Sequence, residues 1–202
     1  MTFYPFFCST KIIYDMNKIV IFASGSGTNA ENIIKYFADK DSGTVVAVFT
    51  NNQNAKVIER AKKHQVPTEI FSKDEFNDGK VLQKINNFQP DWIILAGFLL
   101  KLPKSIIEAY PNKIINIHPA LLPKYGGKGM YGMNVHIAVV ENKEKETGIT
   151  IHYVNENYDE GNVIFQKEVL LTAADSPERV AEKIHELEQR YFPEVIERLL
   201  EN

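Results

Sequence analysis

The stretch Lys18-Ile-Val-Ile-Phe-Ala-Ser-Gly-Ser-Gly-Thr-Asn29 decides the fold class. Its first six residues are almost all apolar, which is typical of a strand buried on both faces of a parallel sheet. The glycine-rich turn that follows leads into a helical pattern that continues through Ala38. A buried strand, a tight turn and a helix in this order predict the beginning of a βαβ unit.

Strands and helices continue to alternate along the chain. We expect strands at 45–49, 68–71, 92–96 and 114–117, with helices at 55–64, 73–88 and 103–110 between them. After a helix near 135–142, alternating residues at 148–154 predict a half-exposed strand that pairs with 163–171. Ser176-Pro177 then begins a long helix with an apolar stripe. The sequence therefore predicts one α/β domain, in which a Rossmann-like N-terminal half of parallel strands continues into a mixed sheet.

Composition narrows the class of protein. The net charge is −3 and the basic residues are scattered, which argues against a nucleic-acid partner. No apolar run approaches the ~18–20 residues of a membrane helix. Cys8 is the single cysteine, which favours a reducing compartment, and we expect a cytoplasmic protein. The histidines show no metal-ligand spacing, so no metal is expected.

The first fifteen residues differ from the rest of the chain. They are rich in aromatic residues and lack the basic start and the cleavage site of a signal peptide. Met16-Asn-Lys18 then opens directly into the first strand. We expect residues 1–15 to be a non-native or disordered leader, Met16 to be the functional start, and 16–202 to form the domain. An intact mass of the native protein that includes 1–15 would contradict this expectation.

The turn Gly25-Ser-Gly-Thr-Asn-Ala30 has the loose pattern GxGxxA between a strand and a helix. Backbone N–H groups at such a helix start bind anions, although a plain glycine-rich turn has the same pattern. A dinucleotide site would place an acidic residue after the second strand. This chain has Thr50-Asn-Asn52 there. The pattern therefore favours one phosphate over a nicotinamide cofactor.

The segment Ile114-Ile-Asn-Ile-His-Pro-Ala-Leu-Leu-Pro123 is the most informative stretch. Strand alternation places Asn116 and His118 on one face, at the carboxyl end where open α/β sheets bind ligands. An amide donor beside a titratable imidazole suits acyl transfer, because one stabilises the oxyanion and the other moves a proton. In isolation, such a histidine is more often structural.

Four segments in this order are similar to the glycinamide ribonucleotide formyltransferases, the folate-dependent enzymes of purine synthesis. They are 24–29, 95–98, 116–125, and 148–152 followed by Asp159-Glu-Gly161. The resemblance runs from about Lys18 to the C-terminus. The Asn-x-His-Pro segment is shared by several formyltransferases, and the Ser-Gly-Ser-Gly-Thr-Asn turn narrows the resemblance to the purine enzymes.

The resemblance implies the roles of particular residues. The catalytic group would be Asn116, His118 and Asp159. The nucleotide substrate would be bound by Gly27, Thr28, Asn29 and Glu188. The co-substrate 10-formyltetrahydrofolate would be bound by Leu99, Leu100, Lys101, Leu102, Asn116, Asn155, Glu156, Asn157, Tyr158 and Asp159. His152 would lie near this site. The partners would be small molecules only, in a monomer or a homodimer.

The implied chemistry is direct transfer, in which Asn116 and protonated His118 stabilise an oxyanion while Asp159 orients His118 and raises its pKa. Taken alone, Asp159 would be a plain turn residue, and its combination with the His-Pro motif favours the site role instead. Leu100 stands where the family has an arginine, and Ala120 where a serine is common. The segment 126–133 is longer than in some members, and it is either a mobile cover or a surface turn.

Other functions stay open. A relative could formylate another amine, such as an aminosugar nucleotide, or hydrolyse the formyl folate. A non-catalytic phosphate- or nucleotide-binding module would explain the glycine turn but not the combination of Asn116, His118 and Asp159. An NAD-dependent oxidoreductase is disfavoured by Thr50-Asn-Asn52.

Overall fold

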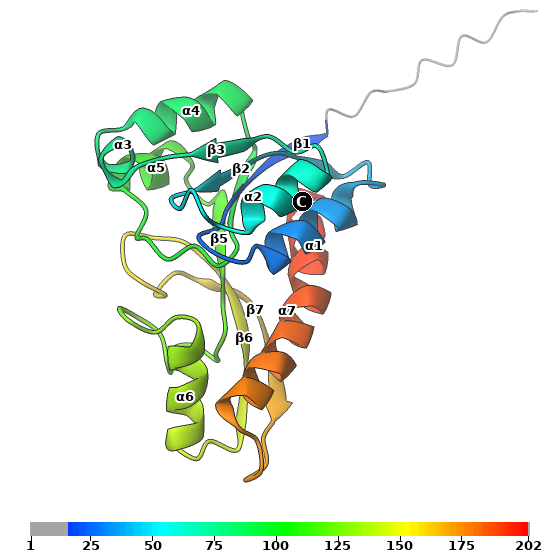
Figure 1. Ribbon diagram of the computed structural model, residues 1–202, viewed down its shortest axis with the longest axis vertical. Helices are drawn as coiled ribbons and strands as arrows, with labels where there is room; N and C mark the ends of the chain where they lie inside the picture. Colours follow the sequence, from blue (N-terminus) through cyan, green and yellow to red (C-terminus); the bar gives the residue numbers. More distant parts are fainter. Residues whose placement is uncertain (1–15, 202) are drawn as a thin grey trace, which may run out of the picture.

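The strands of residues 16–201, the part of the chain that the structure describes, form one sheet in the order β3-β2-β1-β4-β5-β6-β7 (Figure 1). The structure is a computed structural model. The predicted leader, residues 1–15, lies outside the described residues. No helix among the described residues is long and apolar enough to cross a membrane.

The first five strands are parallel to one another, as the apolar runs predict. They are β1 (Asn17–Phe22), β2 (Gly43–Thr50), β3 (Thr68–Ile70), β4 (Trp92–Leu95) and β5 (Ile114–His118). The helices among them are α1 (Thr28–Phe37), α2 (Val57–Lys63), α3 (Lys73–Asn77), α4 (Lys80–Phe88) and α5 (Lys104–Ala109). This half has the predicted Rossmann-like alternation.

The last two strands make the sheet mixed, which confirms the predicted fold class. β6 (Glu146–Tyr153) is antiparallel to β5, and β7 (Val163–Leu170) is antiparallel to β6. α6 (Met133–Glu141) precedes β6, and the long helix α7 (Pro177–Leu200) follows β7. Figure 1 shows α7 running along these strands and reaching α1 at its far end.

The sheet has a hydrophobic core on each face. Ile19 and Ile21 of β1 pack into one core, with residues of α1, α6 and α7. Val20 and Phe22 pack into the other, with residues of α4 and α5. The alternation along one strand therefore explains why β1 is apolar almost throughout.

Two predictions about elements are wrong. The expected helix at 73–88 is two helices, because Gly79 has a left-handed φ of 86° between α3 and α4. The strand predicted as half-exposed is buried from Thr147 to His152. β6 lies inside the sheet between β5 and β7, and polar residues on it are buried because they have hydrogen-bond partners.

Candidate active site

The site lies at the carboxyl ends of β1, β4 and β5, where a cavity of about 740 Å³ opens. The strand order reverses direction between β1 and β4, which is the usual place for a ligand in an open α/β sheet. The loops after these two strands are joined, because Ser24 N–H donates to Gly97 O at 3.0 Å and Leu99 N–H donates to Ser24 Oγ at 3.1 Å.

The turn after β1 forms one wall of the cavity, and Gly27, Thr28 and Asn29 all line it. Gly27 has a left-handed φ of 72°, and a Cβ built on it would lie 2.4 Å from Cγ2 of Val57. Only glycine fits this position. Gly27 caps α1 without a side chain, so the N–H groups of the first helical turn are left for an anion.

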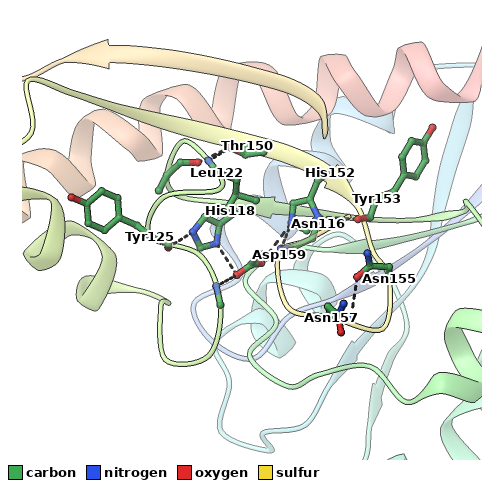
Figure 2. Close-up of polar contacts among 12 residues, drawn as sticks. Asn116, His118, Leu122, Tyr125, Thr150, His152, Tyr153, Asn155, Asn157 and Asp159 are labelled. Atoms are coloured by element: carbon green, nitrogen blue, oxygen red, sulfur yellow. Dashed lines mark hydrogen bonds and ion pairs between the residues drawn. The ribbon is translucent and has the colours of Figure 1, made fainter. Parts of the chain in front are cut away.

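The amide of Asn116 is oriented by His152, its partner across β5 and β6 (Figure 2). His152 Nδ1 lies 2.9 Å from Tyr153 O, which can only accept, so Nδ1 carries the proton. Nε2 of a neutral His152 then accepts from Asn116 Nδ2 at 3.1 Å. This bond directs the NH₂ group of Asn116 toward His152 and leaves its second hydrogen for a ligand.

His118 is held between a backbone carbonyl and a carboxylate, as Figure 2 shows. Its Nε2 donates to Tyr125 O at 2.7 Å, and its Nδ1 lies 3.6 Å from Asp159 Oδ2. The other carboxylate oxygen, Oδ1, lies 3.6 Å from His152 Nε2. Asp159 Oδ2 also accepts from the N–H of Gly127 at 2.9 Å. One carboxylate therefore contacts both histidines and the loop 126–133.

Burial and Asp159 act on the pKa of His118 in opposite directions. Burial lowers the pKa of His118 below its usual value, and the charge of Asp159 raises it, as expected, but only in part. The net direction is downward, because desolvation outweighs the nearby carboxylate. Burial raises the pKa of Asp159, but the proximity of His152 and the charge of His118 together hold it below its usual value. Asp159 is thus ionised at neutral pH.

Glu188 of α7 reaches the glycine turn from the far end of the chain. Its Oε2 accepts from Asn29 Nδ2 at 2.9 Å, and Asn29 Oδ1 accepts from Gln189 Nε2 at 2.8 Å. Glu188 lines the same cavity as Asn29. The structure thus brings the four residues expected to bind the nucleotide, Gly27, Thr28, Asn29 and Glu188, to one wall.

The residues expected to bind the folate divide between two adjoining cavities. Leu99 and Tyr158 line the main cavity. The smaller one, of about 70 Å³, is lined by residues that include Leu100, Lys101, Leu102, Asn155 and Asn157. The two cavities share Phe98, Asn116, Tyr158 and Asp159. Glu156 lines neither cavity, and its carboxylate forms an exposed ion pair with Lys104 Nζ at 3.2 Å.

Some contacts could not be found from the sequence. His136 lies on α6, is 6% exposed and lines the cavity. The carbonyl of Tyr125 and the N–H of Gly127 hold His118 and Asp159, but backbone groups carry no residue-type signal. No group of three or more His, Cys, Asp or Glu in residues 16–201 could hold a metal ion.

Comparison with known proteins agrees with this geometry. The family model described as formyl transferase matches residues 17–196. The phosphoribosylglycinamide formyltransferase of Bacillus subtilis is 33% identical over 191 residues, covering 92% of this chain and 95% of that protein. The chloroplastic enzyme of that name from Arabidopsis thaliana is 36% identical over 186 residues, covering 89% of this chain and 64% of that protein. The chain thus spans less than two thirds of the length of this plant relative.

Solved structures give the same result. The glycinamide ribonucleotide transformylase 1 of Geobacillus kaustophilus superposes with a TM-score of 0.84 at 35% identity, over 92% of this chain and 99% of that one. The corresponding structure from Symbiobacterium toebii has a TM-score of 0.85 at 29% identity, over 92% of this chain and 88% of that one. The chain belongs to the formyl transferase family, in the group of the phosphoribosylglycinamide formyltransferases.

Proposed function

We propose that this protein transfers a formyl group from 10-formyltetrahydrofolate to the primary amine of glycinamide ribonucleotide, in purine biosynthesis. The observation that carries the proposal is that one cavity joins the glycine turn to Asn116, His118 and Asp159. A phosphate on the turn and an acyl group beside the imidazole can therefore belong to substrates bound together. The names of the relatives support the same reaction.

The two substrates would enter from different sides. The phosphate of the nucleotide would bind the N–H groups at the start of α1, with Glu188 beside it on α7. The folate would extend toward the smaller cavity, where Leu100 and Leu102 provide apolar side chains. The two cavities meet at Asn116 and Asp159, so the formyl carbon would lie there.

The chemistry would then be direct attack by the unprotonated amine on the formyl carbon. The oxygen of the tetrahedral intermediate needs donors that are already in place, and the second N–H of Asn116 is one of them. His118 enters as a neutral imidazole, because burial lowers its pKa. The negative charge that develops on the oxygen adds to that of Asp159, and both stabilise the imidazolium that forms when Nδ1 of His118 takes up the proton that the amine releases and Asp159 passes on.

Asp159 would accept and pass on the proton that the amine releases. It is ionised and contacts both histidines, so it can accept the proton that leaves the attacking amine, directly or through water. The proton finally reaches the departing folate nitrogen. No acyl-enzyme is proposed, because the sequence has no serine next to His118 and its single cysteine is at position 8.

An ultraviolet assay of deformylated folate, run with and without glycinamide ribonucleotide, tests the proposal. We expect product to form only when the nucleotide is present, with one formylated amine for each folate consumed. Folate consumption with release of formate in the absence of the amine would show a hydrolase instead. Absence of folate binding in a thermal-shift titration would show a non-catalytic module.

A further inference from the structure

A charged cluster lies behind the glycine turn and takes no part in the cavity. It consists of Glu31 on α1, Arg60 on α2 and His64 directly after α2, and we call it the support cluster. The two helices pack against each other (Figure 1). None of the three residues lines the cavity. The cluster therefore has no part in the proposed chemistry, although a buried charge is costly unless it is paired.

Arg60 connects this cluster to the turn. Its Nε donates to the carbonyl oxygen of Ser26 at 2.9 Å, while Nη1 donates to Glu31 Oε2. Glu31 is only 7% exposed. The hydrogen bond with His64 is the largest cause that lowers the pKa of Glu31 to about 2; burial raises this pKa, but the bond and charge of Arg60 also lower it. Glu31 thus stays ionised and fixes the guanidinium.

The turn presents its carbonyls to α2. Ser26 O accepts from Arg60, and Gly25 O accepts from the N–H of Val57 at 3.2 Å. In a planar trans peptide the C=O and the following N–H point in opposite directions. The N–H groups of Ser26 and Gly27 therefore point away from α2. Ser26 and Gly27 both line the cavity, so these N–H groups are available to an anion there.

We propose that Arg60 is a positioning residue for the substrate phosphate, which acts by holding the Ser26–Gly27 peptide so that its N–H faces the anion. This inference rests on the proposed function, since it assigns the phosphate to the glycine turn. Arginine suits the role because its planar fork bonds to the carboxylate and to the carbonyl together. A lysine ammonium has the same charge but no such fork.

Calorimetric titration with ribose 5-phosphate tests the proposal without requiring turnover. We expect Arg60→Lys and Arg60→Ala each to raise the Kd about tenfold relative to wild type, since a lost charge-assisted hydrogen bond has about this effect. In the transfer assay, KM for the nucleotide should rise about as much. The folate KM and kcat should change less than about twofold, which a merely structural role would not predict.

Lys35→Ala is the matched control. Lys35 Nζ also pairs with Glu31, at 3.4 Å, but its side chain is 56% exposed and makes no bond to the turn. We expect this variant to bind ribose 5-phosphate as the wild type does. Glu31→Gln, which leaves Arg60 in place but weakens its anchor, should lie between wild type and Arg60→Ala. It keeps the proposal testable if Arg60→Ala does not fold.

Three results would contradict these expectations, and each one overturns a particular proposal. Wild-type affinity in Arg60→Lys would show that only the charge matters and would overturn the proposal. Equal changes in both KM values and kcat would show a general structural role and would also overturn it. A wild type that binds ribose 5-phosphate but transfers no formyl group would refute the proposed function alone, and the affinities of the variants would still decide the role of Arg60.

Discussion

Asp159 joins groups that are far apart in the sequence. Its backbone has a left-handed φ of 55°, which an aspartate tolerates better than most residues. This conformation belongs to the turn that the sequence suggests, and the same residue contacts His118, His152 and Gly127. The two interpretations of Asp159, turn residue and site residue, are therefore compatible.

Replacement of His118 or Asp159 tests the proposed chemistry. We expect His118→Ala and Asp159→Asn each to lower kcat by at least ~10²-fold, because each removes a charge that stabilises the transition state. KM for the nucleotide should stay near the wild-type value, since the proposed phosphate site at the glycine turn lies elsewhere in the cavity. Steady-state kinetics check this expectation, and near-native turnover of His118→Ala would rule out the mechanism.

A pair of glycine substitutions tests the geometry of the turn. A Cβ on Gly27 would lie 2.4 Å from Val57 and require a left-handed backbone, whereas a Cβ on Gly25 meets nothing within 4 Å. We expect Gly27→Ala to lower the free energy of unfolding by roughly 1–3 kcal/mol. Gly25→Ala should stay within about 0.5 kcal/mol. Urea denaturation measures both, and equal losses would contradict the packing described for the turn.

At the scale of elements, β6 supports the segment that follows His118. Thr150 is fully buried, and its hydroxyl donates to Ala120 O at 2.7 Å and accepts from Leu122 N–H at 3.0 Å (Figure 2). Gln166 of β7 donates to the same hydroxyl at 2.9 Å. These bonds hold the chain that carries Tyr125, whose carbonyl fixes His118. Ala120 contributes through its backbone, so the absence of the family's common serine does not remove this bond.

Thr150→Val removes these bonds while keeping the shape of the side chain. It leaves buried backbone groups without partners, and we expect the free energy of unfolding to fall by about 1–3 kcal/mol. Thr147→Val is the matched control on the same strand. Thr147 is also buried, but it lies near the start of β6, before the residues that pair with β5. Chemical denaturation should show a much smaller change for the control, and equal changes would contradict the assigned role.

At the scale of the whole molecule, α7 closes the site by bringing Glu188 to Asn29. Burial within the assembled domain also lowers the pKa of His136, although Glu188 opposes this effect. Nδ1 of His136 has no hydrogen-bond partner within the described part of the chain. His118 shows the same direction of shift, so two buried histidines resist protonation in the folded protein.

These shifts predict acid destabilisation. An unfolded histidine binds a proton near pH 6.5, whereas folded His136 does so only at a lower pH. The unfolded state therefore binds more protons in this window, and the free energy of unfolding falls as the pH drops below about 6.5. His136→Leu should reduce this loss. Melting temperatures between pH 8 and pH 5 measure it, and an identical pH dependence in both proteins would refute the role of His136.

The spacing of apolar and polar residues explains which parts of the fold could be predicted from the sequence. The apolar run from Lys18 is buried on both faces, so β1 and the parallel half were predictable. Residues alternate along β6 as in a half-exposed strand. Its polar residues are nevertheless buried, because distant segments supply their hydrogen-bond partners. Alternation cannot reveal those partners, and the prediction for this strand failed for that reason.

By itself, the sequence determined the order of strands and helices, the glycine that permits the tight turn, and the shared face of Asn116 and His118, because these depend on local backbone geometry. Only the tertiary structure decided that Asp159 contacts His118, that Arg60 holds Ser26, and that the pKa of His118 falls. The physical reason is that contacts and desolvation depend on which distant segments cover a side chain, and no local pattern records that.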